Sequence, residues 1–301
     1  MDLNLVHLIF SLTIDGTVSD RFALFRLRRF FPVELRRATC GRTISCGQCM
    51  DAAGCPWFPL FGQPLSSDPA TVKRHQKPPL PFVFDIPFLT PGRADVADAE
   101  IGLTLVGNAV PSADRFIVAV TRMLEGELHG SDPAVSLDCV ASGALSGDRA
   151  PVMPSKGGDV LGNLRILSAQ DVGGGTKGSE GTVNLQVLTP LRLFHEGKLQ
   201  RRLDGSVFLR GLIRRVSSLA AMYGGSEMED DFRWLAERSR GVRLHDAEFL
   251  YDDGGGHSSA GVMGKGSFEG DLDPFLPYLF IGEYLHAGKG ASWGFGRYRL
   301  G

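Results

Sequence analysis

Residues 281–301 read IGEYLHAGKGASWGFGRYRLG, and this stretch is the most informative part of the sequence. Glycines alternate here with cations and aromatic residues, and the members are Gly288, Lys289, Gly290, Trp293, Gly294, Phe295, Gly296 and Arg297. Glycine at this density lets backbone amides approach a phosphate closely, and the cations add charge. Aromatic rings stack on nucleobases. The stretch predicts an RNA-binding loop, although a glycine turn in a hairpin has the same spacing.

The rest of the second half reads as a strand, a helix and further strands. The expected elements are a strand at 182–188, a helix that Ser206 caps and Gly224-Gly225 ends, and strands at 241–251 and 258–268. The helix has an apolar stripe at the spacing of one helical face, with Arg210 and Arg214 on its other flank.

The first half repeats this order of elements. Its expected elements are a strand at 3–13, a helix from Pro32 to about 38, an edge strand at 78–88, a strand at 100–106 and a helix at 112–125. Two such halves predict the α+β class, with two tandem ferredoxin-like (RRM-like) domains at 1–180 and 181–301. Many other folds share this order of elements.

Four of the five cysteines lie within sixteen residues, with the spacing C-x5-C-x2-C-x5-C. In a cytosolic chain such a cluster indicates a metal site more often than disulfides, and zinc takes four thiolates in a tetrahedron. The spacing predicts a structural zinc in an insertion at about 40–61, held by Cys40, Cys46, Cys49 and Cys55. Free thiols and disulfides are the alternatives.

The composition is that of an ordinary globular chain, with 43% hydrophobic and 22% charged residues among 301. A formal net charge of −2 excludes a uniformly basic coat for nucleic acid. The 25 arginines outnumber the 7 lysines and concentrate at 21–42 and 192–215. Arginine suits forked phosphate contacts and stacking on bases, although a solvated helix face has a similar charge pattern. The sequence has no run of about 18 apolar residues and no basic leader, so we expect a cytoplasmic protein with no membrane span.

Residues 268–301 resemble the C-terminal glycine-rich loop of the RAMP superfamily, and more narrowly that of the CRISPR precursor-RNA processing endoribonuclease family. Further stretches are similar to that family in the same order, at 40–61, 101–110, 187–197 and 208–223. The resemblance implies two tandem ferredoxin-like domains that bind a CRISPR repeat RNA, often as a hairpin. It also implies metal-independent cleavage, in which the ribose 2′-OH attacks the adjacent phosphate and mature guide RNA for antiviral defence is released.

The histidines depart from the family's pattern. Many members carry a catalytic histidine in or near the first helix, but the matching stretch here, 21–39, has none. The histidines of the chain are His7, His75, His129, His195, His245, His257 and His286. We predict that His286, three residues before Lys289, and next His195 act in proton transfer. The alternative for His286 is a residue that orders the glycine loop.

RNA contacts are expected from three groups of residues. These are Arg28, Arg29, Arg36 and Arg37 in the first half, Arg210 and Arg214 on the second-half helix, and Gly288, Lys289, Gly290, Gly294, Phe295, Gly296 and Arg297 in the C-terminal loop. No cofactor is expected for catalysis. One alternative function is a non-catalytic RAMP subunit that binds and caps guide RNA in a CRISPR effector complex with other subunits. The other is a zinc-stabilised α+β protein with no RNA role.

Overall fold

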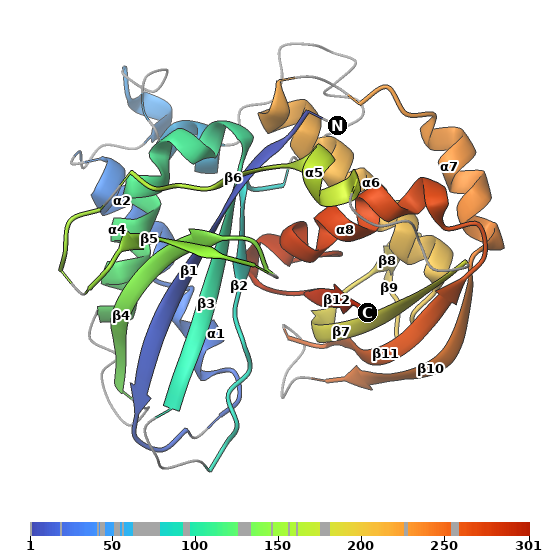
Figure 1. Ribbon diagram of the computed structural model, residues 1–301, viewed down its shortest axis with the longest axis horizontal. Helices are drawn as coiled ribbons and strands as arrows, with labels where there is room; N and C mark the ends of the chain where they lie inside the picture. Colours follow the sequence, from blue (N-terminus) through green and yellow to red (C-terminus); the bar gives the residue numbers. More distant parts are fainter. Residues whose placement is uncertain are drawn as a thin grey trace. The chain divides into compact units, whose positions relative to one another are not determined.

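The computed structural model describes residues 2–18, 20–40, 42, 46–50, 55, 57–62, 79–92, 97–125, 134–145, 147–155, 157–160, 162–174, 181–225, 228–253 and 259–301. The chain divides into two compact units (Figure 1). One contains Val6–Pro81 and Asp85–Ile166, and the other contains Met1–Leu5, Phe82–Phe84 and Leu167–Gly301. We call them the N-terminal and C-terminal units. A domain boundary between 180 and 181 stays a prediction.

A six-stranded sheet organises the first half of the chain. The sheet order is β2-β3-β1-β4-β5, and β6 also pairs with β1. The strands are β1 (Asn4–Asp15), β2 (Phe82–Asp85), β3 (Ala97–Val106), β4 (Ala134–Gly143), β5 (Arg149–Met153) and β6 (Ile166–Ser168). The helices are α1 (Ala23–Leu27), α2 (Phe31–Thr39) and α4 (Ala113–Glu125). Helices follow β1 and β3, so β1 to β4 have the βαββαβ order of a ferredoxin-like fold, and β5 extends the sheet beyond β4.

Alternating apolar residues place β1 between two buried layers. Val6, Leu8 and Phe10 are fully buried on one face, and Leu5 and His7 are buried on the other, so β1 is covered on both faces, whereas its period-two pattern predicts burial of one face alone. Helices α2 and α4 pack together through Phe31 and Phe116, whose ring centroids lie 6.0 Å apart. Pro32 stands in the first turn of α2, where its missing N–H leaves no hydrogen bond unmade.

The second half has the same topology. A four-stranded sheet has the order β10-β11-β7-β12, and a separate two-stranded sheet pairs β8 with β9. The strands are β7 (Thr182–Leu191), β8 (Phe194–His195), β9 (Lys198–Leu199), β10 (Arg243–Asp252), β11 (Gly261–Glu269) and β12 (Tyr298–Leu300). The helices are α5 (Ala169–Gly174), α6 (Gly205–Leu219), α7 (Phe232–Arg238) and α8 (Leu276–Leu285). The order β7, α6, β10, β11, α8, β12 again gives βαββαβ, so the predicted α+β fold with tandem ferredoxin-like halves is confirmed.

Two boundaries differ from the sequence prediction. Asp204, not Ser206, caps α6, because its carboxylate accepts the amide of Val207 at 2.8 Å. The Ser206 hydroxyl instead shares a hydrogen bond of 2.8 Å with Ser239. Strand β7 continues to Leu191, beyond the expected end at 188, because Leu191 pairs with Val262 of β11. Within the described residues, every helix is too short or too polar to span a bilayer.

Candidate nucleic-acid interface

The glycine-rich loop begins where α8 ends and returns to the sheet as β12. His286 terminates α8 with φ 57° and ψ 172°. The loop then turns at four glycines with positive φ, which are Gly288 (78°), Gly290 (85°), Gly294 (89°) and Gly296 (62°). Residues with a β-carbon rarely adopt these angles. The backbone conformation of the loop is therefore sufficient to explain why these four residues are glycines, without any contact to a ligand.

Close packing also requires glycine at two of these positions. A β-carbon on Gly288 would lie 2.7 Å from the carbonyl oxygen of Arg192, and one on Gly296 would collide with the carbonyl oxygen of Ala287. The side chain of Thr189 also fixes the loop, donating to Gly294 O at 2.8 Å and accepting the amide of Arg297 at 2.9 Å. The loop is thus built onto the end of β7.

Many backbone amides of the loop already donate to protein oxygens. The acceptors lie within 2.8–3.4 Å, and the donating residues are Ala287, Lys289, Trp293, Gly294, Phe295, Gly296 and Arg297. A phosphate could use one of these amides only by replacing an existing hydrogen bond. Side chains on the loop's exposed edge are therefore better placed to contact RNA than most of its backbone.

A half-buried arginine is hydrogen-bonded to the loop. The Arg215 Nε donates to the carbonyl oxygen of Leu285 at 2.8 Å, and its Nη2 donates to Ser292 Oγ at 3.3 Å. Burial lowers the pKa of Arg215 to about 10, so the guanidinium remains charged at neutral pH. The sequence analysis did not single out Arg215, although it lies in the predicted arginine cluster. Its role is structural.

Exposed cations and one aromatic ring gather beside the loop. The Lys289 Nζ lies 5.1 Å from the ring centroid of Phe194, which is 42% exposed on β8. A tight turn at Glu196 and Gly197, with φ of 50° and 77°, joins β8 to β9 and leaves His195 and Lys198 exposed. We call Lys289, Phe194, His195 and Lys198 the hairpin–loop surface. It combines charge with a stacking face, which are groups that bind single-stranded RNA, and it also carries an imidazole.

The structure separates the two histidines predicted to act in catalysis. The His286 side chain is fully buried, and its amide donates to Gly282 O at 2.7 Å to end α8. His195 is exposed on the hairpin, next to Phe194. As the chain is folded here, only His195 of this pair can reach an RNA bound at the hairpin–loop surface.

The other predicted RNA contacts differ in exposure. Lys289, Arg214, Arg29 and Arg37 are exposed, and Arg297, Arg210, Arg28 and Arg36 are half-buried. Arg210 Nε donates to Ser206 O at 3.2 Å, and Arg37 pairs with Glu34 at 2.6 Å. Phe295 is only 4% exposed and has the guanidinium of Arg192 over its ring at 5.8 Å. The ring of Phe295 is therefore covered and not available for stacking on a base as the chain is folded here.

Sequence reasoning missed Phe194 and Arg192. The four residues after Phe194, HEGK, carry the turn signal that could have located the hairpin, since glycine after an exposed polar residue favours a tight reversal. No comparable signal marks Arg192, because its position over Phe295 depends on contacts between distant parts of the chain.

The cysteine cluster forms a short turn in its described part. The segment Cys46–Gln48 is a single 3₁₀ turn, and the amide of Cys49 donates to Cys46 O at 3.3 Å. Cys40, Cys46, Cys49 and Cys55 are free thiols, as is Cys139. In the part of the chain that the structure describes, no three His, Cys, Asp or Glu side chains come together as a metal site. We assign no role to a metal here, and the zinc stays a prediction.

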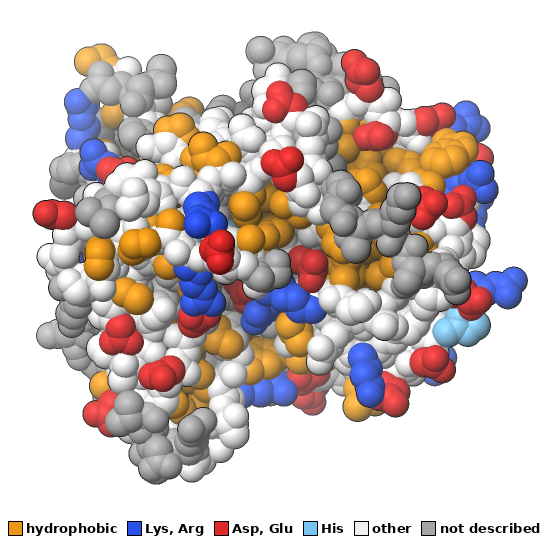
Figure 2. All heavy atoms as spheres, viewed as in Figure 1, with side chains coloured by type: hydrophobic (Ala, Val, Ile, Leu, Met, Phe, Trp, Pro, Cys, Tyr) orange, Lys and Arg blue, Asp and Glu red, His pale blue; other side chains and the backbone are white. Residues whose placement is uncertain are grey.

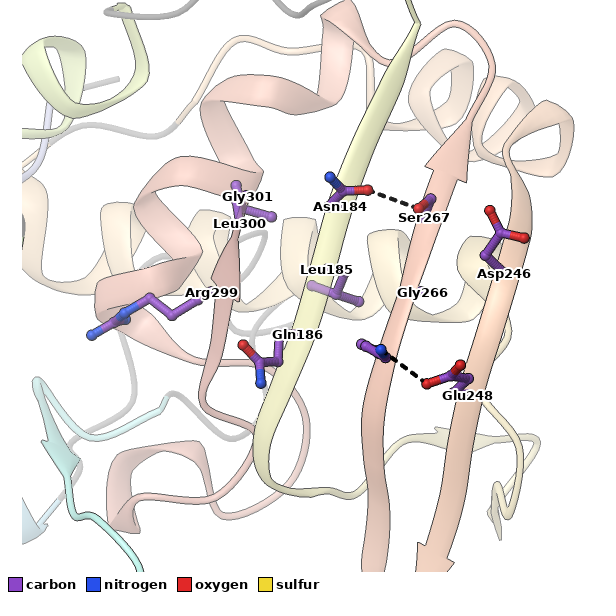
Figure 3. Close-up of a pocket in the computed structure, with 11 residues that line it drawn as sticks. Asn184, Leu185, Gln186, Asp246, Glu248, Gly266, Ser267, Arg299, Leu300 and Gly301 are labelled. Atoms are coloured by element: carbon purple, nitrogen blue, oxygen red, sulfur yellow. Dashed lines mark hydrogen bonds and ion pairs between the residues drawn. The ribbon is translucent and has the colours of Figure 1, made fainter.

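The uncovered face of the four-stranded sheet holds a shallow hollow of about 390 Å³ (Figure 3). Polar side chains line it, including Asn184, Gln186 and Arg299, with Ser267 donating to Asn184 at 2.8 Å. Lys265 and Glu248 form an ion pair of 3.1 Å on the same face. RRM domains stack bases on aromatic side chains of such a face, and none lines this hollow. The hollow therefore lacks the aromatic side chains on which an RRM domain stacks bases.

Charges on the drawn face of the molecule are mixed. Figure 2 shows Lys and Arg side chains interspersed with Asp and Glu, without a continuous basic coat. Local clusters of cations must therefore supply any contacts with phosphate, as the net charge of −2 requires.

Comparison with known proteins identifies the family. A model of the CRISPR-associated endoribonuclease Cas6 matches residues 185–298, and a model of an N-terminal domain matches residues 9–162. No curated protein sequence matches the chain. Among solved structures, Thermus thermophilus Cas6 is 11% identical with a TM-score of 0.57, over 100% of this chain and 99% of that one.

Two further solved structures share the fold. A Cas6 product complex is 13% identical with a TM-score of 0.59, over 98% of this chain and 99% of that one. A partial Cas6-RT-Cas1–Cas2 complex contains a chain that is 12% identical with a TM-score of 0.55, over 99% of this chain and 46% of that one. The match of residues 185–298, which contain the glycine loop and its sheet, identifies this part of the chain as a member of the CRISPR-associated endoribonuclease Cas6 family, and the solved Cas6 structures share the fold of the whole chain.

Proposed function

We propose that this protein binds CRISPR repeat RNA and cuts within it to release guide RNA. The observation that carries the proposal is the hairpin–loop surface. It places a stacking ring on Phe194 beside a cation on Lys289, and the next residue of the same hairpin, His195, carries an exposed imidazole. A repeat that folds as a hairpin would present its paired phosphates to such a surface, and affinity would then depend on salt concentration.

The proposed chemistry is internal transfer without a metal cofactor. The 2′-oxygen loses its proton to a general base and bonds to the adjacent phosphorus. The bond from phosphorus to the 5′-oxygen breaks, and that oxygen receives a proton from a general acid. The products are a 2′,3′-cyclic phosphate and a 5′-OH, so no external water or oxidant enters the step. Imidazole suits either proton transfer near neutral pH, and Lys289 suits the charge on the phosphorane.

His195 is the better candidate for proton transfer, and His286 is the better candidate for ordering the loop. Exposure separates them, because a catalytic side chain must contact the reacting atoms and His286 lies inside its unit. Sequence reasoning alone ranked His286 first. The structural argument reverses that order, and mutation of both residues tests it.

The decisive experiment incubates the purified protein with labelled repeat RNA in EDTA and in Mg²⁺ and maps the product ends. We expect equal cleavage in both buffers and a 5′-OH end. His195→Ala should slow cleavage by about 10²–10⁴-fold and leave affinity nearly unchanged. His245→Ala is the matched control, since His245 is also exposed in this unit but pairs with Glu269 at 2.6 Å. Equal slowing by both variants would contradict the assignment.

A second function is favoured by one observation. The stretch 21–39 has no histidine, which suits an RNA-binding RAMP subunit without cleavage, acting with other CRISPR proteins. If the wild-type protein binds repeat RNA and leaves it uncut in both buffers, this second function replaces the first.

A further inference from the structure

We propose that the N-terminal unit carries a stacking platform for unpaired nucleotides of the RNA, formed by Arg21, Phe22, Arg28 and Phe88 over Phe25. We call these five residues the α1 platform. The proposal rests on the proposed function, because it adds a second contact site for the same RNA. It names the part of the substrate that this site would take, a single-stranded segment of the RNA.

Three phenylalanines form the base of the platform. The ring centroids of Phe22 and Phe88 lie 4.9 Å apart at an interplanar angle of 71°. Phe25 lies 5.9 Å from Phe22 and 5.3 Å from Phe88. Phe25 is buried, while Phe22 and Phe88 are half-buried. The cluster is therefore anchored in the core and reaches the surface through two of its rings.

Arginine guanidiniums lie over these rings. Arg21 is 4.8 Å from the centroid of Phe22 and 5.2 Å from that of Phe88, and Arg28 is 5.1 Å from that of Phe25. A guanidinium held over a ring keeps its charge and has a second flat face. A nucleobase can stack on that face while the N–H groups at the edge contact a phosphate.

Charge on the surrounding segment favours a polyanion. Residues 20–37 contain six arginines and two acids, Asp20 and Glu34. Both acids pair within the segment, Asp20 with Arg26 and Glu34 with Arg37. The segment has a formal charge of +4, from six arginines and two acids, and two of these arginines, Arg21 and Arg28, lie over the aromatic rings. RNA is the ligand already proposed for this protein, and it carries both the anionic phosphates and the bases that this surface fits.

The platform is ordered before any ligand binds. The amide of Leu89 donates to Arg21 O at 3.2 Å, which joins the segment after β2 to the start of α1. The amide of Phe22 donates to Asp20 Oδ1 at 3.0 Å. These bonds hold Phe22 and Phe88 in register, so little conformational entropy is lost when a base stacks on them.

The same contact elsewhere in the chain provides a matched control. On α7, the Arg238 guanidinium lies 5.1 Å from the ring centroid of Trp234, which is 41% exposed. Residues 229–238 contain four acids and two arginines, and Arg238 also pairs with Asp271 at 3.3 Å. The α7 pair therefore offers a ring and a guanidinium in an acidic setting that repels phosphate.

The test uses a ten-nucleotide single-stranded RNA that contains 2-aminopurine, whose fluorescence falls when the base stacks. The wild-type protein should bind it and quench the fluorescence. A Phe22→Leu, Phe88→Leu double variant should bind about 10-fold more weakly, because base–aromatic stacking contributes on that scale. Arg21→Lys keeps the charge but removes the flat guanidinium, so it should reduce the quenching without the loss of apolar packing. Trp234→Leu should change neither readout.

Three results would overturn the platform. One is unchanged affinity and quenching in the double variant with its circular dichroism spectrum intact. Another is RNA binding by the wild type without quenching, which would indicate phosphate contacts alone. The third is an equal loss in Trp234→Leu. Cleavage of repeat RNA is measured separately, so a protein that does not cut but shows the expected quenching keeps the platform and loses the endonuclease assignment.

Discussion

The two arginine-rich segments, 192–215 and 20–37, look alike in the sequence and differ in the structure. In the first, Arg215 donates to the carbonyl oxygen of Leu285 before the glycine loop, and Arg210 donates to a backbone carbonyl of its own helix. In the second, Arg21, Arg28 and Arg29 lie over phenylalanine rings near the surface. Arg215 and Arg210 therefore support the fold, whereas the three arginines of the second segment lie on aromatic rings. The difference lies in what each guanidinium contacts, which a residue count does not reveal.

The largest expected effect is a loss of folding stability, and it tests whether close packing requires the glycines of the loop beside residues 192–215. Gly296→Ala should destabilise the protein by about 4 kcal/mol, since it adds left-handed strain to a collision with Ala287 O. Gly197→Ala is the control, because Gly197 has φ 77° but open space around it, and it should lose only about 1 kcal/mol. Urea unfolding measures both changes. Equal losses would show that backbone strain alone, not packing, requires these glycines.

The next largest effect is a difference in stability between variants of two adjacent arginines of α6. Arg215→Ala should destabilise the protein by about 3 kcal/mol, because Leu285 O and Ser292 lose a charged donor inside the fold. Arg214→Ala should stay within about 0.5 kcal/mol, since Arg214 is exposed. Thermal and urea unfolding report the difference. A large loss of stability in Arg214→Ala would contradict the distinction between structural and surface arginines in this segment.

A smaller effect compares the cations of the two units in RNA binding. Lys289→Gln and Arg28→Gln should each lower the slope of log affinity against log salt by about 0.7, the value for one phosphate contact on a single strand. The double variant Lys289→Glu, Arg297→Glu should flatten the slope further. Anisotropy titrations at several salt concentrations give the slopes. An unchanged slope in the double variant, with the fold intact, would contradict phosphate contact at the glycine loop.

The smallest expected effect on RNA affinity comes from removing a metal from the cysteines that follow α2. Metal analysis of protein purified without chelator should find about one zinc per chain if Cys40, Cys46, Cys49 and Cys55 bind it as predicted. Because those thiols lie outside the α1 platform and the hairpin–loop surface, chelation should change stability more than RNA affinity. Titration of every cysteine as a free thiol in the native protein would contradict the zinc.

The fold could be predicted further than the site. Period-two alternation located β1 and β7, and Pro32 located the start of α2, because each of these signals depends on neighbouring residues. Alternation did not locate β12. This strand has only three residues and follows a glycine-rich loop, and it forms by pairing with β7. Sequence reasoning also failed for His286, whose burial follows from packing of α8 against distant elements. The cap of α6 was placed at Ser206 because serine and aspartate both suit that position.

The hydrogen-bonded amides of the glycine loop have a consequence for the kinetics of RNA capture. A loop whose backbone is already fixed has no slow closing step after collision. Binding should then follow a single phase whose observed rate rises linearly with RNA concentration, and electrostatic attraction should set its speed. The same amides should be slow to exchange with deuterium in the free protein. RNA that docks on the side chains of the loop would change their protection little, whereas protection would rise at any amide that binds phosphate.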